Sequence, residues 1–238
     1  MLSREETLLN NLKEVQLSLR NACQRTGRNP QTVTLLAVTK YACDADVLTL
    51  LKTGQITDVA ESRVQQALAR WKDNPAFRDF SAVRKHLIGH LQKNKAAKAA
   101  QFFDFIDTLD DFETARILDE HVPDGKIVRA LVQVKLTDKQ TQSGLPLEKA
   151  RMLVAQLKHT SFAKLRVCGY MAIAPQISPD RLRPLFRSVN EAFEKDFPSS
   201  QERWLSLGMS EDFTVAVEEG STLPRIGSRL FAKNLEEA

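Results

Sequence analysis

The feature that most constrains this fold is an alternation of short apolar segments with amphipathic helical segments along the whole chain. An apolar run without polar alternation is typical of a strand buried on both faces of a parallel sheet. Every predicted strand but the last is followed by a predicted helix, which indicates an all-parallel sheet. The eight predicted strands cover residues 35–40, 56–60, 87–89, 103–109, 127–136, 165–174, 204–207 and 223–226.

Eight such repeats within 238 residues predict an α/β protein whose sheet closes into a (β/α)8, or TIM-type, barrel. Residues 3–25 add an amphipathic helix before the first strand, with Ser3 and Glu6 spaced for a capping box. We expect residues 1–238 to form a single barrel domain with this extra N-terminal helix. The alternative is an open doubly wound sheet, which is disfavoured because no GxGxxG motif follows the first strand.

For three of the helices between strands, the sequence predicts specific boundaries. One is expected over residues 62–71, one begins with Asp110 as its N-cap, and one covers residues 210–219.

Composition and charge exclude several classes of function. Thirty-four basic and thirty acidic residues leave a net charge of only +4 without a basic block, so nucleic-acid binding is not indicated. The three cysteines lie far apart and no HExxH motif is present, so neither disulfides nor a metal site is predicted. No apolar stretch approaches the ~20 residues that cross a bilayer, and acids stand where a signal peptide carries bases. We expect a cytoplasmic protein that binds neither nucleic acid nor membrane.

Lys40 stands at the carboxyl end of the first predicted strand. A partly desolvated lysine at such a position is a candidate amine nucleophile that forms a Schiff base with a carbonyl compound. The alternative is a lysine that closes the strand end with its ammonium group in water. The carboxyl ends of barrel strands carry the active sites of these folds, so the predicted barrel favours a functional Lys40.

Small residues stand at the ends of the seventh and eighth predicted strands and in the loops after them. Loops at these positions form the recurrent phosphate site of such barrels, and Ser206, Gly208, Gly227 and Ser228 suit that role. The alternative is that they are ordinary turn residues. A lysine and a phosphate site on the same face together meet the anchoring needs of pyridoxal phosphate, with its aldehyde at one end and its phosphate at the other.

With these residues in place, the chain resembles the pyridoxal phosphate homeostasis proteins, single-domain relatives of the N-terminal barrel of alanine racemase. The resemblance covers nearly the whole chain through residues 35–40, 86–95, 143–144, 169–173, 205–212 and 225–231. It implies that Lys40 forms the internal aldimine with the cofactor. It also implies that Ser206 and the backbone amides of Gly227 and Ser228 hold the phosphate, and that Arg225 faces the pyridine nitrogen, where its permanent charge disfavours protonation of that nitrogen.

One block departs from the family pattern. This chain has Ala60-Glu61-Ser62-Arg63 where the family usually has Gly-Glu-Asn-Tyr, so an asparagine that would flank the cofactor is absent. Glu61 remains at a strand end, either as a functional group or as an acid at a helix N-terminus. Met171 either lines the pocket or fills the core, and we favour the core.

The resemblance implies a pyridoxal phosphate-binding protein of intracellular vitamin B6 homeostasis or carriage without an evident catalytic activity. Enzymes that depend on the cofactor are candidate client partners. The alternative is a pyridoxal phosphate-dependent amino-acid racemase, which needs acid/base groups on both faces of the substrate Cα. Neither Tyr41 nor Tyr170 is an evident second base, and the absence of a second domain favours a monomer. A cofactor-free aldolase that uses Lys40 would need an acid/base partner that the sequence does not identify.

Overall fold

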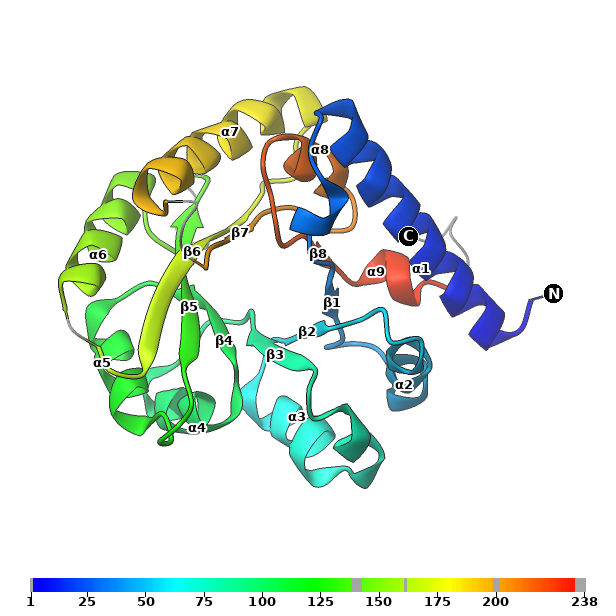
Figure 1. The fold of residues 1–238 in the computed structure, drawn as a ribbon, viewed down its shortest axis with the longest axis horizontal. Coiled ribbons are helices and arrows are strands. Elements are labelled where there is room, and N and C mark those ends of the chain that lie inside the picture. Colours follow the sequence, from blue (N-terminus) through cyan, green and yellow to red (C-terminus); the bar gives the residue numbers. More distant parts are fainter. Residues whose placement is uncertain (1, 138–142, 161, 199–201, 234–238) are drawn as a thin grey trace.

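Eight parallel strands form a nearly closed barrel surrounded by helices, which confirms the predicted fold (Figure 1). The computed structural model describes residues 2–137, 143–160, 162–198 and 202–233. Neighbouring strands follow the order β7-β6-β5-β4-β3-β2-β1-β8. The strands are β1 Leu36–Val38, β2 Asp58–Glu61, β3 Arg84–Leu87, β4 Phe105–Leu109, β5 Val128–Lys135, β6 Leu165–Ile173, β7 Trp204–Ser206 and β8 Arg225–Ile226.

Backbone hydrogen bonds between the β7 and β8 segments join the two ends of the sheet. The amide of Leu223 donates to the carbonyl of Leu205 at 3.0 Å, and that of Arg225 donates to the carbonyl of Gly208 at 3.0 Å. All ladder pairings are parallel within the described ranges, so the carboxyl ends of the strands meet at one face of the barrel.

Helices surround the barrel, and the predicted N-terminal helix is present with its capping box between Ser3 and Glu6. The α-helices are α1 Arg4–Arg25, α2 Asp44–Lys52, α3 Val64–Leu68, α4 Lys93–Phe102, α5 Phe112–His121, α6 Leu147–His159, α7 Pro179–Asp196, α8 Phe213–Glu218 and α9 Ser228–Phe231. Short 3₁₀ helices cover Pro30–Thr32 and Pro75–Phe80, and a π-helix covers Ala69–Asp73. No helix within the described ranges is both long and apolar enough to cross a membrane.

Several helix boundaries differ from the sequence-based expectations. The last strand is followed by a helix, α9, so the expectation that it lacks one is wrong. The N-cap of α5 is Asp111 and not Asp110, because the extended backbone of Asp111 lets its carboxylate accept the amide of Thr114 at 3.0 Å. Helix α8 begins at Phe213 and not at residue 210, because Asp212 closes a turn by accepting the Met209 amide at 2.6 Å.

The expected helix over residues 62–71 is also shorter than predicted. It is α-helical only over Val64–Leu68 and then widens into the π-helix Ala69–Asp73. The sequence contains no proline or glycine in this stretch that could have indicated the change.

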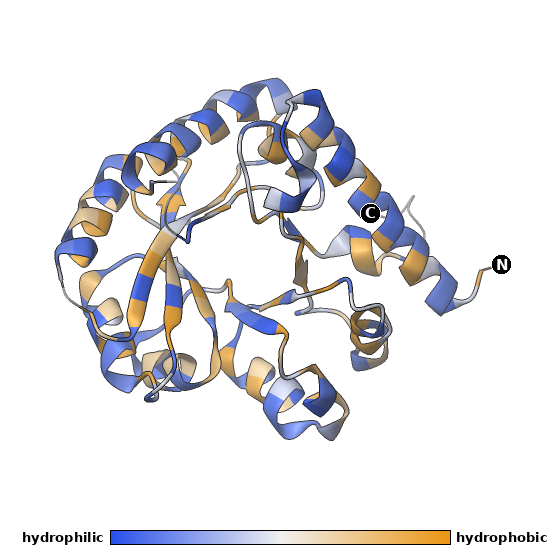
Figure 2. Cartoon of the chain, viewed as in Figure 1, coloured by the Kyte–Doolittle hydropathy of each residue, from blue (hydrophilic) through white to orange (hydrophobic). Residues whose placement is uncertain are grey.

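Apolar side chains fill two layers of the molecule. The outer layer lies between strands and helices, so the helices carry hydrophilic residues on their outer faces, as along α7 in Figure 2. The inner layer fills the barrel and includes Met171, which confirms its assignment to the core. Its fully buried members are Leu36, Ala60, Phe105, Leu131, Cys168, Met171 and Leu223.

Candidate functional site

A cavity of about 780 Å³ opens where β1 and β8 and the segments after β6 and β7 meet. Its lining includes four of the five residues predicted for the site, namely Lys40, Arg225, Gly227 and Ser228. The fifth, Ser206, is fully buried and does not belong to that lining. The barrel thus brings together residues that are up to 188 positions apart, from Lys40 to Ser228.

Lys40 lies in a tight turn directly after β1. The amide of Ala42 donates to the carbonyl of Thr39 at 3.0 Å, so Lys40 and Tyr41 are the two central residues of a β-turn. The Lys40 Nζ lies 4.9 Å from the centroid of the Tyr41 ring, and Tyr41 is 91% exposed. Both side chains line the cavity.

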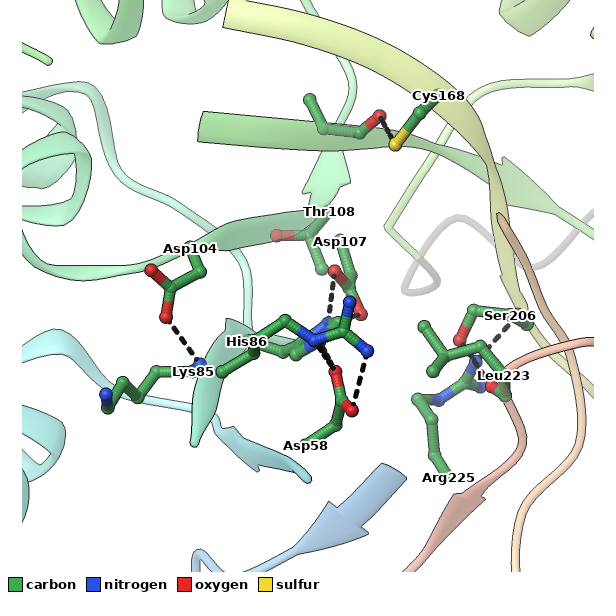
Figure 3. A network of polar contacts seen from close by, with 12 residues as sticks. Asp58, Lys85, His86, Asp104, Asp107, Thr108, Cys168, Ser206, Leu223 and Arg225 are labelled. Carbon is green, nitrogen blue, oxygen red and sulfur yellow. Dashed lines mark hydrogen bonds and ion pairs between the residues drawn. The ribbon is translucent and has the colours of Figure 1, made fainter. Parts of the chain in front are cut away.

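Arg225 reaches the cavity from β8 and is held by uncharged acceptors. Its Nη1 donates to the carbonyl and hydroxyl oxygens of Ser206 at 2.7 and 2.8 Å (Figure 3). Its Nη2 donates to the carbonyl of Ala172 at 2.8 Å. Burial lowers the pKa of Arg225 to about 10, although Asp107 and Asp212 oppose that shift. The guanidinium therefore stays charged at neutral pH. Ser206 also donates its hydroxyl to the Leu223 carbonyl at 3.0 Å.

Ser210 and Asp212 line the cavity beside the predicted residues, and sequence reasoning did not assign them a role. The Ser210 Oγ accepts the backbone amides of Gly227 at 3.3 Å and Arg229 at 3.4 Å. Ser228 is the first residue of α9, so its amide has no hydrogen-bond partner within that helix. Burial raises the pKa of Asp212, against the opposing effects of the Met209 amide and Arg225.

A buried charge cluster lies inside the barrel on β2, β3 and β4. His86 contacts Asp107 through Nδ1 at 3.1 Å and Asp58 through Nε2 at 3.0 Å, and Arg84 donates to Asp58 at 2.8 Å (Figure 3). Burial alone would lower the pKa of His86, but Asp107 and Asp58 raise it to about 9. The imidazole is thus protonated at neutral pH and links the two carboxylates.

Glu61 is not an acid at a helix N-terminus, and the functional role expected as the other alternative stays a prediction. It does not cap α3, whose N-cap is Arg63 without a side-chain cap bond. Its carboxylate accepts the Thr39 hydroxyl at 2.7 Å and the Arg70 Nη1 at 2.7 Å, and so it lies behind the turn that carries Lys40.

Tyr170 lies outside the cavity, in agreement with the expectation that it is no evident second base. Its hydroxyl donates to the Asp196 carboxylate at 2.7 Å, and burial raises its pKa well above the usual range. Among the described residues, no group of three histidine, cysteine or acidic side chains is placed to hold a metal ion.

Some of the residues that the sequence analysis did not assign lie in segments with a sequence signal, and others do not. Ser210 and Asp212 lie within the block 205–212, and His86 begins the block 86–95, so family-like segments already contained them. Arg70 lies in none of those blocks. Its contact with Glu61 depends on the π-helix, for which the sequence carries no signal.

Comparison with known proteins decides the family. A family model described as the alanine racemase N-terminal domain matches residues 11–234. The pyridoxal phosphate homeostasis protein of Haemophilus influenzae is 32% identical over 228 residues, which cover 93% of this chain and 93% of that protein. The chain belongs to this family. The Escherichia coli K12 member, of the same name, is 31% identical over 231 residues, 94% of this chain and 95% of its own.

Solved structures of relatives share the barrel. PipY of Synechococcus elongatus PCC7942, solved with pyridoxal phosphate bound, has a TM-score of 0.75 and 29% identity over 90% of this chain and 100% of its own. An alanine racemase of Clostridium difficile 630 has a TM-score of 0.68 at 13% identity, with 94% of this chain and 56% of its own covered. The racemase likeness, at that identity, shows a shared fold alone.

Proposed function

We propose that this protein binds pyridoxal phosphate covalently through Lys40 and serves in intracellular vitamin B6 homeostasis, as the names of its relatives indicate. The observation that carries the proposal is the common cavity, which Lys40, Arg225, Gly227 and Ser228 all line. When bound, the cofactor supplies an aldehyde that condenses with a primary amine and releases water.

The chain's own residues fit such a ligand. Lys40 lines the cavity, and its amine lies over the ring of Tyr41. Arg225 presents a fixed positive charge, which would disfavour protonation of a pyridine nitrogen held beside it. The amide of Ser228, together with the hydroxyl of Ser210, which accepts two backbone amides and keeps its own hydrogen, offers donors to an anionic phosphate.

The covalent bond is tested by borohydride reduction of the protein after addition of pyridoxal phosphate. We expect a visible absorbance band before reduction and a mass increase on the peptide that contains Lys40 afterwards. The Lys40→Ala variant should lose both, whereas Lys52→Ala, which removes an exposed lysine from α2, should keep both. A label on other lysines with Lys40 unmodified would overturn the proposal.

We propose further that the protein lacks amino-acid racemase activity. Racemisation needs proton transfer on both faces of the substrate Cα. Tyr41 adjoins Lys40 on the same turn, and Tyr170 is bonded to Asp196 away from the cavity, so neither supports a second base opposite Lys40. Incubation of the loaded protein with a panel of amino acids in heavy water should leave their Cα protons unexchanged.

Three remaining features of the function are proposals on the same footing. If the protein transfers the cofactor directly to client enzymes, the loaded protein should reactivate an apoenzyme faster than the cofactor dissociates from the protein into solution. A monomer predicts the mass of one chain in light scattering. A cytoplasmic location is supported by three free cysteines, and cell fractionation tests it.

A further inference from the structure

Arg70 binds the backbone on both sides of Lys40. Its Nη1 donates to the carbonyl of Thr39 at 2.8 Å, and its Nη2 donates to the carbonyl of Ala42 at 2.6 Å. These two residues are the first and last of the β-turn whose centre is Lys40 and Tyr41. A single guanidinium therefore joins the ends of the turn that carries the lysine.

Two carboxylates hold the guanidinium in place. Arg70 Nε donates to Asp44 at 2.7 Å, and Nη1 also donates to Glu61 at 2.7 Å. The Glu61 side chain is only 3% exposed and that of Arg70 only 15%, so water screens this ion pair weakly. The planar guanidinium has donors at fixed angles, which is what four acceptors in different directions require.

The contact depends on the π-helix at Ala69–Asp73. Adjacent residues of an α-helix do not face the same way, yet Arg70 and Trp71 both donate to the same Glu61 oxygen, at 2.7 and 3.4 Å. The widened helical turn thus aims two consecutive side chains at the carboxylate behind the Lys40 turn. Such π-helical turns are rare and frequently lie at functional sites.

We infer that Arg70 is a positioning residue, which holds the Lys40 turn in its binding geometry before the cofactor arrives. This inference rests on the proposed role of Lys40. A lysine on a loose turn would have to be ordered during binding, and that ordering lowers affinity, whereas a turn that is already held avoids the loss. No contact of Arg70 with the cavity itself is involved, because Arg70 does not line it.

The test compares two substitutions of the same kind. Arg70→Lys keeps a positive charge opposite Glu61, but a lysine cannot donate to Thr39, Ala42 and the carboxylates together. The matched control is Arg84→Lys, which alters another arginine paired with a buried carboxylate, Asp58, at the amino ends of the strands. Thermal midpoints of both variants measure the general loss of stability.

Two readouts distinguish positioning from stability. The first is hydrogen exchange of the Ala42 amide in protein without cofactor, which we expect to accelerate about tenfold or more in Arg70→Lys, because the turn opens more often. The second is the affinity for added pyridoxal phosphate, which we expect to fall about tenfold. Arg84→Lys should leave both within twofold of wild type.

Two results for these variants would overturn the inference. Exchange and affinity within twofold of wild type in Arg70→Lys would overturn the inference, as would an equal loss of affinity in Arg84→Lys. If wild-type protein itself takes up no cofactor on Lys40, the proposed function fails. In that case, faster exchange in Arg70→Lys would show that Arg70 holds the turn, but Arg70 would have no role in cofactor binding.

Discussion

His86 shows how a single buried residue makes the stability of this barrel depend on pH. Its imidazole lies between Asp58 and Asp107 and is fully buried. Burial opposes protonation, but the two carboxylates outweigh it and raise the pKa from 6.5 to about 9. A raised pKa in the folded state stabilises the fold fully below pH 6.5, and this contribution is lost as the pH rises to 9.

We therefore expect the free energy of unfolding of the wild type to fall by up to about 3 kcal/mol between these pH values. Urea titrations at both ends measure it. His159→Gln, at an exposed position of α6, should keep this slope, and His86→Gln should lose most of it. If His86→Gln does not fold, the imidazole signals of wild-type His86 by NMR decide the matter, because a neutral ring at pH 7 contradicts the prediction.

Ser206 and Ser210 differ in their predicted roles: the first is structural, and the second binds the cofactor. Ser206 bonds to Arg225 and Leu223 beneath the cavity, whereas Ser210 lines it. We expect Ser210→Ala to weaken pyridoxal phosphate binding about tenfold, the effect of a lost hydrogen bond to a charged group. Ser206→Ala should chiefly lower stability, by about 1 kcal/mol. Equilibrium titration and urea unfolding of both variants measure these effects, and the reverse order of affinities would favour the phosphate role that the resemblance implies for Ser206.

At the scale of elements, α1 supports the short helix at the cavity. The Asn11 amide group donates to the carbonyls of Leu230 and Ala232, both at 3.1 Å, and Arg4 donates to the carbonyl of Phe231 at 2.8 Å. These carbonyls belong to the end of α9, whose first residue is Ser228. A four-residue helix is not stable alone, so α1 holds it in place.

We expect Asn11→Ala to destabilise the protein by about 1 to 3 kcal/mol, because two carbonyls lose their shared donor. Asn10→Ala is the matched control, since Asn10 is its exposed neighbour on the same helix and should change stability by less than about 0.5 kcal/mol. Urea unfolding of both variants decides between them. Equal effects would mean that the loss reflects helix composition and not the contact with α9.

At the scale of the whole molecule, two neighbouring strands of the barrel, β6 and β7, approach each other very closely. Gly169 on β6 pairs with Trp204 on β7, and a Cβ at Gly169 would lie 1.7 Å from the Trp204 carbonyl oxygen. The backbone conformation of Gly169 is ordinary, so space between the strands is what excludes a side chain there. One methyl group at this position forces β6 and β7 apart.

Gly169→Ala should therefore destabilise the fold by more than about 3 kcal/mol or prevent folding. Gly125→Ala is the control, because Gly125 has a positive φ of 78° with open space around it and should cost only about 1 kcal/mol of backbone strain. Circular dichroism with urea unfolding compares them. A loss for Gly169→Ala no larger than that for Gly125→Ala would show that the strands adapt.

The sequence by itself determined the alternation, and with it the barrel, its N-terminal helix and the place of Lys40 at a strand end. These follow from local hydrophobic periodicity and from the rule that parallel strands share one carboxyl face. The small residues after the last two strands are local signals of the same kind, so Gly227 and Ser228 could be placed at the cavity in advance.

Only the tertiary structure decided which polar groups meet. Ser206 ends β7 and Ser210 follows four residues later in the loop, and the direction of each hydroxyl depends on how β7 closes against β8. His86 gains its charge from carboxylates on two neighbouring strands, which no local pattern encodes. Arg70 reaches the Lys40 turn through a π-helix. These interactions depend on long-range packing, and a linear sequence specifies such packing only through the complete fold.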